Sequence, residues 1–180
     1  MSTEQPENSA APAAAPAPAD GVFGTPEPQQ SGANKTLIAL GAGLVAAVIA
    51  AVVYSYVVKA GYDFDLDKGE VSITRYTYAA IGVGALIGAV IGKLGGRNIA
   101  LWIVGAVLAA VAILFGELYG AGLAADEMTK GEVSAFSIFT DGLVDNIKGW
   151  ADALTGKEWA FLVLGPLAAV AASFKLGSDD

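Results

Sequence analysis

The sequence predicts an all-α integral membrane protein: a four-helix bundle with an additional amphipathic helix on its extracytoplasmic side. Three observations support this fold class. Of the 180 residues, 54% are hydrophobic and only 16% are charged, which is too apolar for an ordinary soluble domain of this length. Four apolar stretches are candidates for crossing a bilayer. Within them, small residues recur at every fourth position, which places them on one face of a helix.

The composition also excludes several classes of function. The chain contains no Cys and no His, so thiol chemistry, zinc sites and histidine-based catalysis are ruled out. A net charge of −8 argues against attraction to nucleic acid or to anionic lipid, since both require clustered Lys and Arg. We therefore expect no nucleic-acid partner, no cofactor and no catalytic activity.

The two ends of the chain differ from its middle. Residues 1–34 are rich in Ala, Pro, Ser, Gln and Glu and are too polar and too simple in sequence to form a packed core. We interpret them as a disordered cytoplasmic tail. Residues 177–180 form a short C-terminal tail. The membrane domain is thus expected to cover residues 35–176.

Four spans are predicted within this domain, at residues 36–58, 76–92, 99–120 and 159–174. The first contains 23 residues. At about 1.5 Å per residue it is about 34 Å long, enough for a hydrocarbon core of about 30 Å.

The second predicted span carries a row of glycines. Gly84, Gly88 and Gly92 lie on one face of the helix. Since a glycine costs up to about 1 kcal/mol relative to alanine in a helix, a compensating interaction is expected. Close approach of another helix in lipid supplies it. Gly43 and Gly116 belong to similar rows in the first and third spans. We favour packing within the chain, with self-association between chains as the alternative.

The loop between the second and third spans indicates the orientation. It carries Lys93 and Arg97 and no acid, and the positive-inside rule places such a short basic loop in the cytoplasm. Four spans then put both termini in the cytoplasm. The count over all loops opposes this, with six Lys or Arg outside and four inside. An aromatic belt at the outer ends of the spans supports the alternation: Tyr54, Tyr56, Tyr76, Tyr78, Tyr119 and Trp159.

An amphipathic helix is predicted over residues 134–154, between the third and fourth spans. At 100° per residue, six apolar side chains share a narrow sector, while Asp141, Asp145, Lys148 and Asp152 lie opposite. We expect this helix to lie flat on the outer surface. Its predicted anchors are Phe136, Leu143, Ile147 and Trp150.

Three acids before the second span resemble the opening of a calcium-binding loop. Asp63, Asp65 and Asp67 alternate as its carboxylate ligands do. However, Lys68 stands where the sharp-turn glycine is required, and Thr74 where a bidentate acid is required. We therefore favour a solvated acidic loop over a metal site.

Glu117 is the acid that falls within a predicted span. It lies about 27 Å along the helix that starts at Ile99, which places it near the outer interface. We expect it to reach water there. The alternative is an intramembrane acid with a functional role.

These features favour a multi-pass protein of a bacterial cell membrane that acts as a structural or interaction component. Its expected partners are the lipid bilayer and either further copies of the chain or another membrane protein. No small-molecule substrate is indicated. The alternative is a small oligomeric channel or transporter assembled through the glycine-rich faces. Against it, the spans show neither rings of polar residues nor paired broken helices.

Overall fold

The computed structural model describes residues 32–65 and 70–178, and most of them are helical. The tail was predicted at residues 1–34; residues 1–31 and the last two residues of the chain lie outside the described residues, whereas residues 32–34 belong to the first helix. The elements, in chain order, are α1 (Gly32–Lys59), β1 (Tyr62–Asp65), β2 (Glu70–Ile73), α2 (Ala79–Gly95), α3 (Ile99–Met128), α4 (Ser137–Thr140), α5 (Leu143–Asp152) and α6 (Gly156–Gly177).

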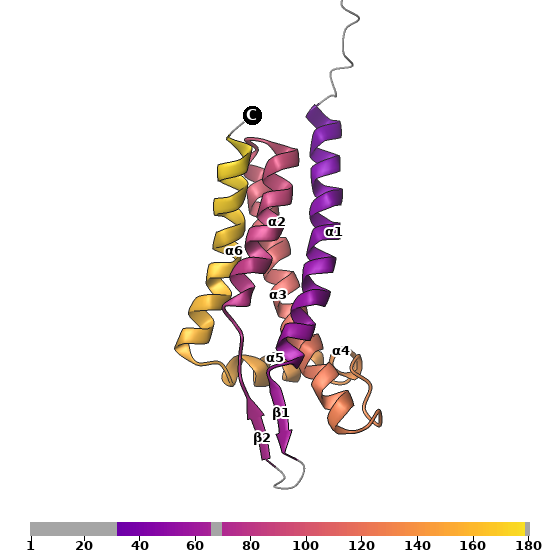
Figure 1. The fold of residues 1–180 in the computed structure, drawn as a ribbon. Coiled ribbons are helices and arrows are strands. Elements are labelled where there is room, and N and C mark those ends of the chain that lie inside the picture. Colours follow the sequence, from indigo (N-terminus) through magenta and orange to yellow (C-terminus); the bar gives the residue numbers. More distant parts are fainter. Residues whose placement is uncertain (1–31, 66–69, 179–180) are drawn as a thin grey trace, which may run out of the picture.

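Helices α1, α2, α3 and α6 form an elongated bundle (Figure 1). The start of α1, the end of α6 and the α2–α3 turn lie together at one end, called here the terminal end. The two strands and helices α4 and α5 lie at the opposite end, called here the hairpin end. The chain thus passes up and down the bundle as the predicted alternation requires.

Three of the described helices, α1, α3 and α6, are long and apolar enough to cross a membrane. Helix α2 is a shorter apolar helix of 17 residues, or about 25 Å, compared with a hydrocarbon core of about 30 Å. Helix α3 has 30 residues and continues beyond its predicted end at Gly120. Length and composition therefore support three spanning helices, with α2 packed among them.

Local sequence signals set the helix ends. Asn98 precedes α3, and its side chain accepts a hydrogen bond from a first-turn backbone N–H at 3.1 Å. Thr155 precedes α6 and forms a capping box with Glu158. Gly96 follows α2 with a φ of +58°, which glycine adopts without a steric cost. These caps confine the turns to the ends of the bundle.

The most extensive helix contacts join α2 to α6 and α1 to α3. Both members of each pair run in the same direction, so neither pair is joined by a short turn. Between α2 and α6 the facing residues follow the same order along both helices: Gly84 with Gly165, Gly88 with Ala169, and Gly92 with Ser173.

The fold is predominantly helical, as predicted, but it also contains a small β-hairpin where the sequence predicted an acidic loop. Strand β1 pairs antiparallel with β2, and Tyr62 lies opposite Ile73. Phe64 stacks near Tyr62 with ring centroids 6.3 Å apart. Because side chains alternate between the faces of a strand, Tyr62 and Phe64 share one face while Asp63 takes the other. This alternation stabilises a hairpin where the acids alone indicate a loop.

The amphipathic helix predicted over residues 134–154 is not continuous. It is divided into a single turn, α4, and the longer α5. Gly142 between them has a φ of +84°, in the left-handed region that favours glycine. The Asn146 side chain closes the break by donating a hydrogen bond to the Ile138 carbonyl at 2.7 Å. The apolar sector therefore does not extend as one stripe across both segments.

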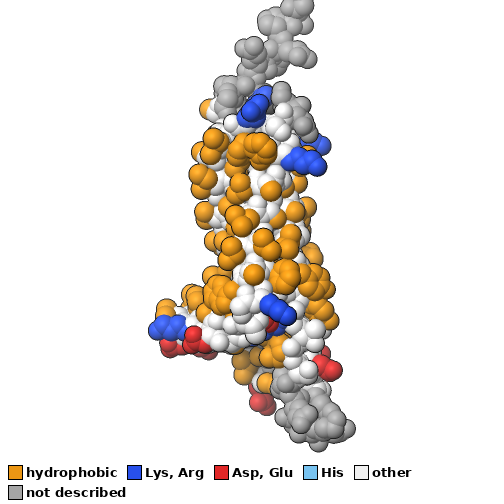
Figure 2. All heavy atoms as spheres, turned by 90° about the vertical axis from the view of Figure 1, so that its left-hand side faces the viewer, with side chains coloured by type: hydrophobic (Ala, Val, Ile, Leu, Met, Phe, Trp, Pro, Cys, Tyr) orange, Lys and Arg blue, Asp and Glu red, His pale blue; other side chains and the backbone are white. Residues whose placement is uncertain are grey.

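The surface divides into three zones along the bundle (Figure 2). Hydrophobic side chains cover its middle, Lys and Arg appear without acids at the terminal end, and acids appear together with Lys and Arg at the hairpin end. Among the described residues, the charged side chains of the terminal end are all basic: Lys35, Lys93, Arg97 and Lys175.

Candidate functional site

The candidate site is a group of polar side chains buried at the hairpin end of the bundle. Glu117 of α3 is its centre and is only 5% exposed. The expectation that this carboxylate reaches water is therefore wrong. Its depth along α3 is as predicted, but other elements of the chain cover it. A buried carboxylate is costly unless hydrogen-bond donors surround it.

Two donors from different elements meet this carboxylate. The Tyr54 hydroxyl of α1 donates a hydrogen bond to Oε1 of Glu117 at 2.5 Å, and Tyr54 is itself 1% exposed. The indole N–H of Trp150 in α5 donates to Oε2 at 3.4 Å. Each carboxylate oxygen thus accepts one hydrogen bond, and Glu117 ties α1, α3 and α5 together.

A second polar group lies beside the first and involves the start of α6. The backbone N–H of Thr155 donates a hydrogen bond to one oxygen of Glu158 at 2.6 Å, and Nε of Arg75 lies 3.5 Å from the other. Nη1 of Arg75 is buried without a hydrogen-bond partner among the described residues. The Glu158 carboxylate therefore joins the capping box of α6 to the segment between β2 and α2.

Tyr62 of the hairpin links the two groups electrostatically. Burial raises the pKa of its hydroxyl above the usual range for tyrosine. The positive charge of Arg75 opposes this shift, and the negative charge of Glu117 adds to it. The hairpin, α1, α3, α5 and α6 thus all contribute to one polar region.

The glycines singled out in the sequence all lie at close helix contacts. A Cβ atom added to Gly84 would overlap the Gly165 backbone, and one added to Gly88 would come within 2.6 Å of the Ala169 Cα. A Cβ atom added to Gly92 would likewise lie 2.6 Å from the Cα of Ser173. Gly43 and Gly116 instead face side chains, those of Ile91 and Tyr54 respectively.

The predicted interfacial anchors have divergent environments. Phe136 is 56% exposed and Leu143 is also exposed, whereas Ile147 and Trp150 are half-buried. Trp150 packs against Trp159 of α6 with ring centroids 5.8 Å apart. Of these four side chains, only Trp150 joins the polar region.

The acidic hairpin shows no arrangement suited to a metal. Among the described residues, no group of three or more carboxylates, His or Cys lies close enough to hold an ion. Asp63 is exposed. Asp67 and the side chain of Asp65 lie outside the described residues, so the calcium-loop hypothesis stays untested for them.

Four side chains of the polar region are not identified as site residues from the sequence: Tyr54, Tyr62, Arg75 and Glu158. Tyr54 was assigned to the aromatic belt, and Arg75 carried no recognisable motif. The available signal was spacing: in α1 and α3, Tyr54 and Glu117 lie at similar distances from the terminal end. Pairing them requires knowing that α1 and α3 are neighbours.

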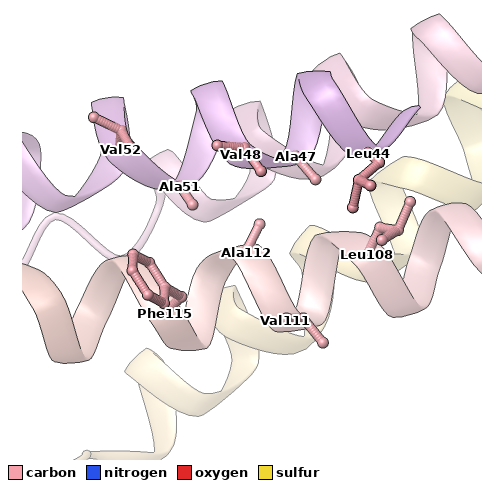
Figure 3. A pocket seen from close by; sticks show the side chains of 9 residues that line it. All are labelled: Leu44, Ala47, Val48, Ala51, Val52, Leu108, Val111, Ala112 and Phe115. Atoms are coloured by element: carbon pink, nitrogen blue, oxygen red, sulfur yellow. The ribbon is translucent and has the colours of Figure 1, made fainter. Parts of the chain in front are cut away.

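Apolar grooves run along the sides of the bundle. One between α1 and α3 has a volume of about 240 Å³ (Figure 3). Ala51 and Ala112 point toward one another across it, and Phe115 lies at one end. No polar side chain lines the groove. It can therefore contact apolar groups, but its side chains could neither bind a metal nor take part in catalysis.

A scan against models of known protein families finds no match, and neither the search of curated proteins nor that of solved structures finds a similar chain.

Proposed function

We propose that the protein is a multi-pass integral membrane protein of a bacterial cell membrane, and that it acts as a structural or interaction component without catalytic activity. The observation that carries this proposal is the zoned surface, in which an apolar middle separates a basic end from an end that also carries acids (Figure 2). Membrane proteins distribute charge in this way, because ionisable side chains are costly in the hydrocarbon core.

Helix α2 is the fourth span in this proposal. Leu86 on its outer side is 49% exposed, which suits contact with lipid. Tyr76 and Tyr78 pack edge to face just before the helix, with ring centroids 6.0 Å apart, as aromatic residues at a membrane interface do. Direct contact with the α6 backbone along its glycines supports the short helix inside the bundle.

The terminal end faces the cytoplasm in this proposal. The short α2–α3 turn there carries Lys93 and Arg97, and the positive-inside rule places such a short basic loop in the cytoplasm. The hairpin end carries five of the nine described Lys and Arg residues, so the assignment rests on this turn and not on the total count. The hairpin, α4 and α5 then lie outside. There, the exposed Phe136 and Leu143 are available to the membrane interface or to a partner protein.

Cysteine labelling tests this topology directly, because the chain contains no Cys. Ser178→Cys lies at the terminal end and Asp145→Cys at the hairpin end, and both positions are exposed. In intact cells an impermeant maleimide should label position 145 and not 178, and lysis should make both reactive. Labelling at 178 alone in intact cells would reverse the orientation. Equal labelling at both would refute insertion as a four-span bundle.

One observation favours the second candidate function, a small channel or transporter. Glu117 is an ionisable residue buried within a helix of spanning length, and such residues mark ion or proton pathways in many transporters. Its two hydrogen bonds to Tyr54 and Trp150 support a structural role equally well. Measuring ion leakage from proteoliposomes distinguishes the structural role from the channel or transporter. A purified structural component should leave a trapped ion gradient intact. A leak that Glu117→Gln abolishes would establish the channel or transporter.

A further inference from the structure

A groove at the hairpin end separates the hairpin from the last turn of α3, and it is called here the edge groove. It has a volume of about 300 Å³. The side chains of Tyr62 and Phe64 share one face of β1, while Asp63 takes the other. All three line the groove, so it faces the edge of the strand and not one of its faces. The end of α3 forms the opposite wall with Glu127, Met128 and Lys130.

The pairing register shows what the backbone of β1 presents along this edge. The N–H of Thr74 donates a hydrogen bond to the Gly61 carbonyl at 2.7 Å. In an antiparallel pair, such hydrogen-bonded positions alternate with positions whose backbone groups point away from the partner strand. Asp63 is therefore hydrogen-bonded to β2, whereas the N–H and C=O groups of Tyr62 and Phe64 point outward. An added strand pairs with outward backbone groups in this alternation.

Acids outnumber bases on the two segments that form the edge groove. Residues 59–64 and 126–132 carry four acids and two bases: Asp63, Asp126, Glu127, Glu132, Lys59 and Lys130. The free carbonyls at the C-terminal end of α3 add partial negative charge. The groove therefore favours a positively charged partner.

We propose that the edge groove binds an extended, basic peptide segment of a partner protein, which adds a third strand to the hairpin beside β1. The peptide backbone pairs with the outward groups of Tyr62 and Phe64. Its Lys or Arg side chains lie beside Asp63 and the acids at the end of α3. This inference rests on the proposed function, because it names the kind of partner that the interaction component takes.

Charge and distance disfavour two other occupants. Pairing of β1 with β1 of a second copy would bring two acidic grooves together, and like charges across a strand pair are destabilising. Residues 1–31 contain four acids and no Lys or Arg. They also join the bundle at the start of α1, whose 28 residues extend about 42 Å from the terminal end.

Fluorescence polarisation measures this binding. The probe is a fluorescein-labelled Lys-Thr-Lys-Thr-Lys-Thr peptide, since threonine favours an extended backbone. The matching Glu-Thr repeat is its acidic counterpart. Each is titrated with the purified full-length protein in neutral detergent micelles. We expect saturable binding of the basic probe, about tenfold or more tighter than that of the acidic probe, and weaker binding at high salt.

Two substitutions at one position isolate the backbone contact. Phe64→Ala and Phe64→Pro both remove the ring, but only Phe64→Pro removes the outward N–H. Neither removes a hydrogen bond to β2, and a free strand edge tolerates proline. Phe64→Pro should bind the basic probe about tenfold or more weakly than Phe64→Ala. Retained hydrogen-exchange protection of the Asp63 N–H shows that the hairpin is intact in both variants.

Two further pairs test the walls and the charge of the groove. Met128→Trp fills the groove, whereas Val133→Trp places the same ring on a similarly exposed position that does not line it. Only Met128→Trp should weaken binding, by about tenfold or more. Asp63→Asn should weaken binding of the basic probe several-fold. Asp141→Asn, the same change at an exposed acid outside the groove, should leave binding unchanged.

The absence of saturable binding, or equal binding by Phe64→Ala and Phe64→Pro, would overturn the proposal. Equal affinity for the basic and acidic probes would also overturn it, because the acids would then select nothing. A dimer in light scattering that Met128→Trp dissociates would assign the groove to a second copy instead. Failure of the proposed membrane topology has a separate readout, since cysteine labelling is measured in cells and peptide binding in detergent.

Discussion

Gly88 provides the sharpest test of how the bundle is held together. In Gly88→Ala the new Cβ would meet the backbone of Ala169, with its Cα 2.6 Å away. No rotamer change relieves this contact, so α2 and α6 must move apart. Overpacking of this kind typically costs about 1–3 kcal/mol. The higher helix propensity of alanine offsets up to about 1 kcal/mol of this cost.

Gly82→Ala is the matched control, since it makes the same chemical change in the same helix. A Cβ at Gly82 meets nothing within 4 Å. The propensity gain is common to both variants, so the difference between them isolates the packing cost. We expect Gly88→Ala to unfold several degrees below Gly82→Ala in a thermal assay in detergent, at about 2–4 °C for each kcal/mol. Equal transition temperatures would refute the close contact between α2 and α6.

Four further substitutions test individual interactions in the same assay. Ser173→Ala removes a buried hydrogen bond to the Gly88 carbonyl, 2.9 Å long, and should cost about 0.5–1.5 kcal/mol; no loss would mean that this bond is absent. Glu117→Ala leaves two buried donors without an acceptor and should cost about 1–3 kcal/mol more than Glu117→Gln; the reverse order would contradict the network. Glu127→Gln breaks a salt bridge with exposed partners and should change stability by about 1 kcal/mol or less; a larger loss would show an unexpected network. Gly142→Ala should cost about 1–2 kcal/mol, because its φ is left-handed, and unchanged hydrogen exchange in α5 would contradict the break.

The predominantly helical fold and its long apolar helices were predictable because they depend on local properties. Hydrophobicity and length identify α1, α3 and α6 without knowledge of their neighbours. The small-residue spacing of α2 predicts a helix with one smooth face, but spacing alone does not say which helix lies against it. The partner is α6, distant in sequence and parallel to α2.

The errors arose where a local pattern had two physical outcomes. The acids around Asp63 indicated a loop, although alternation at Tyr62 and Phe64 was also present and predicts a strand. The periodicity of residues 134–154 indicated one helix, although Gly142 permits a left-handed break. In both cases the backbone geometry of a turn decided between the two outcomes. Only a few residues encode that geometry, whereas many residues contribute to the pattern on either side of it.

Glu117 and Trp150 show why the polar region could not be assembled from the sequence. The position of Glu117 along one helix correctly placed it near the hairpin end but gave no information about what covers it. The apolar sector of the amphipathic segment predicted Trp150 as an interfacial anchor, and it treated the indole as an apolar surface. In the structure the indole N–H donates a hydrogen bond to Glu117, so the anchor is polar at its tip. The burial of the acid and the docking of α5 are therefore one interaction, and a substitution at either residue should disturb both.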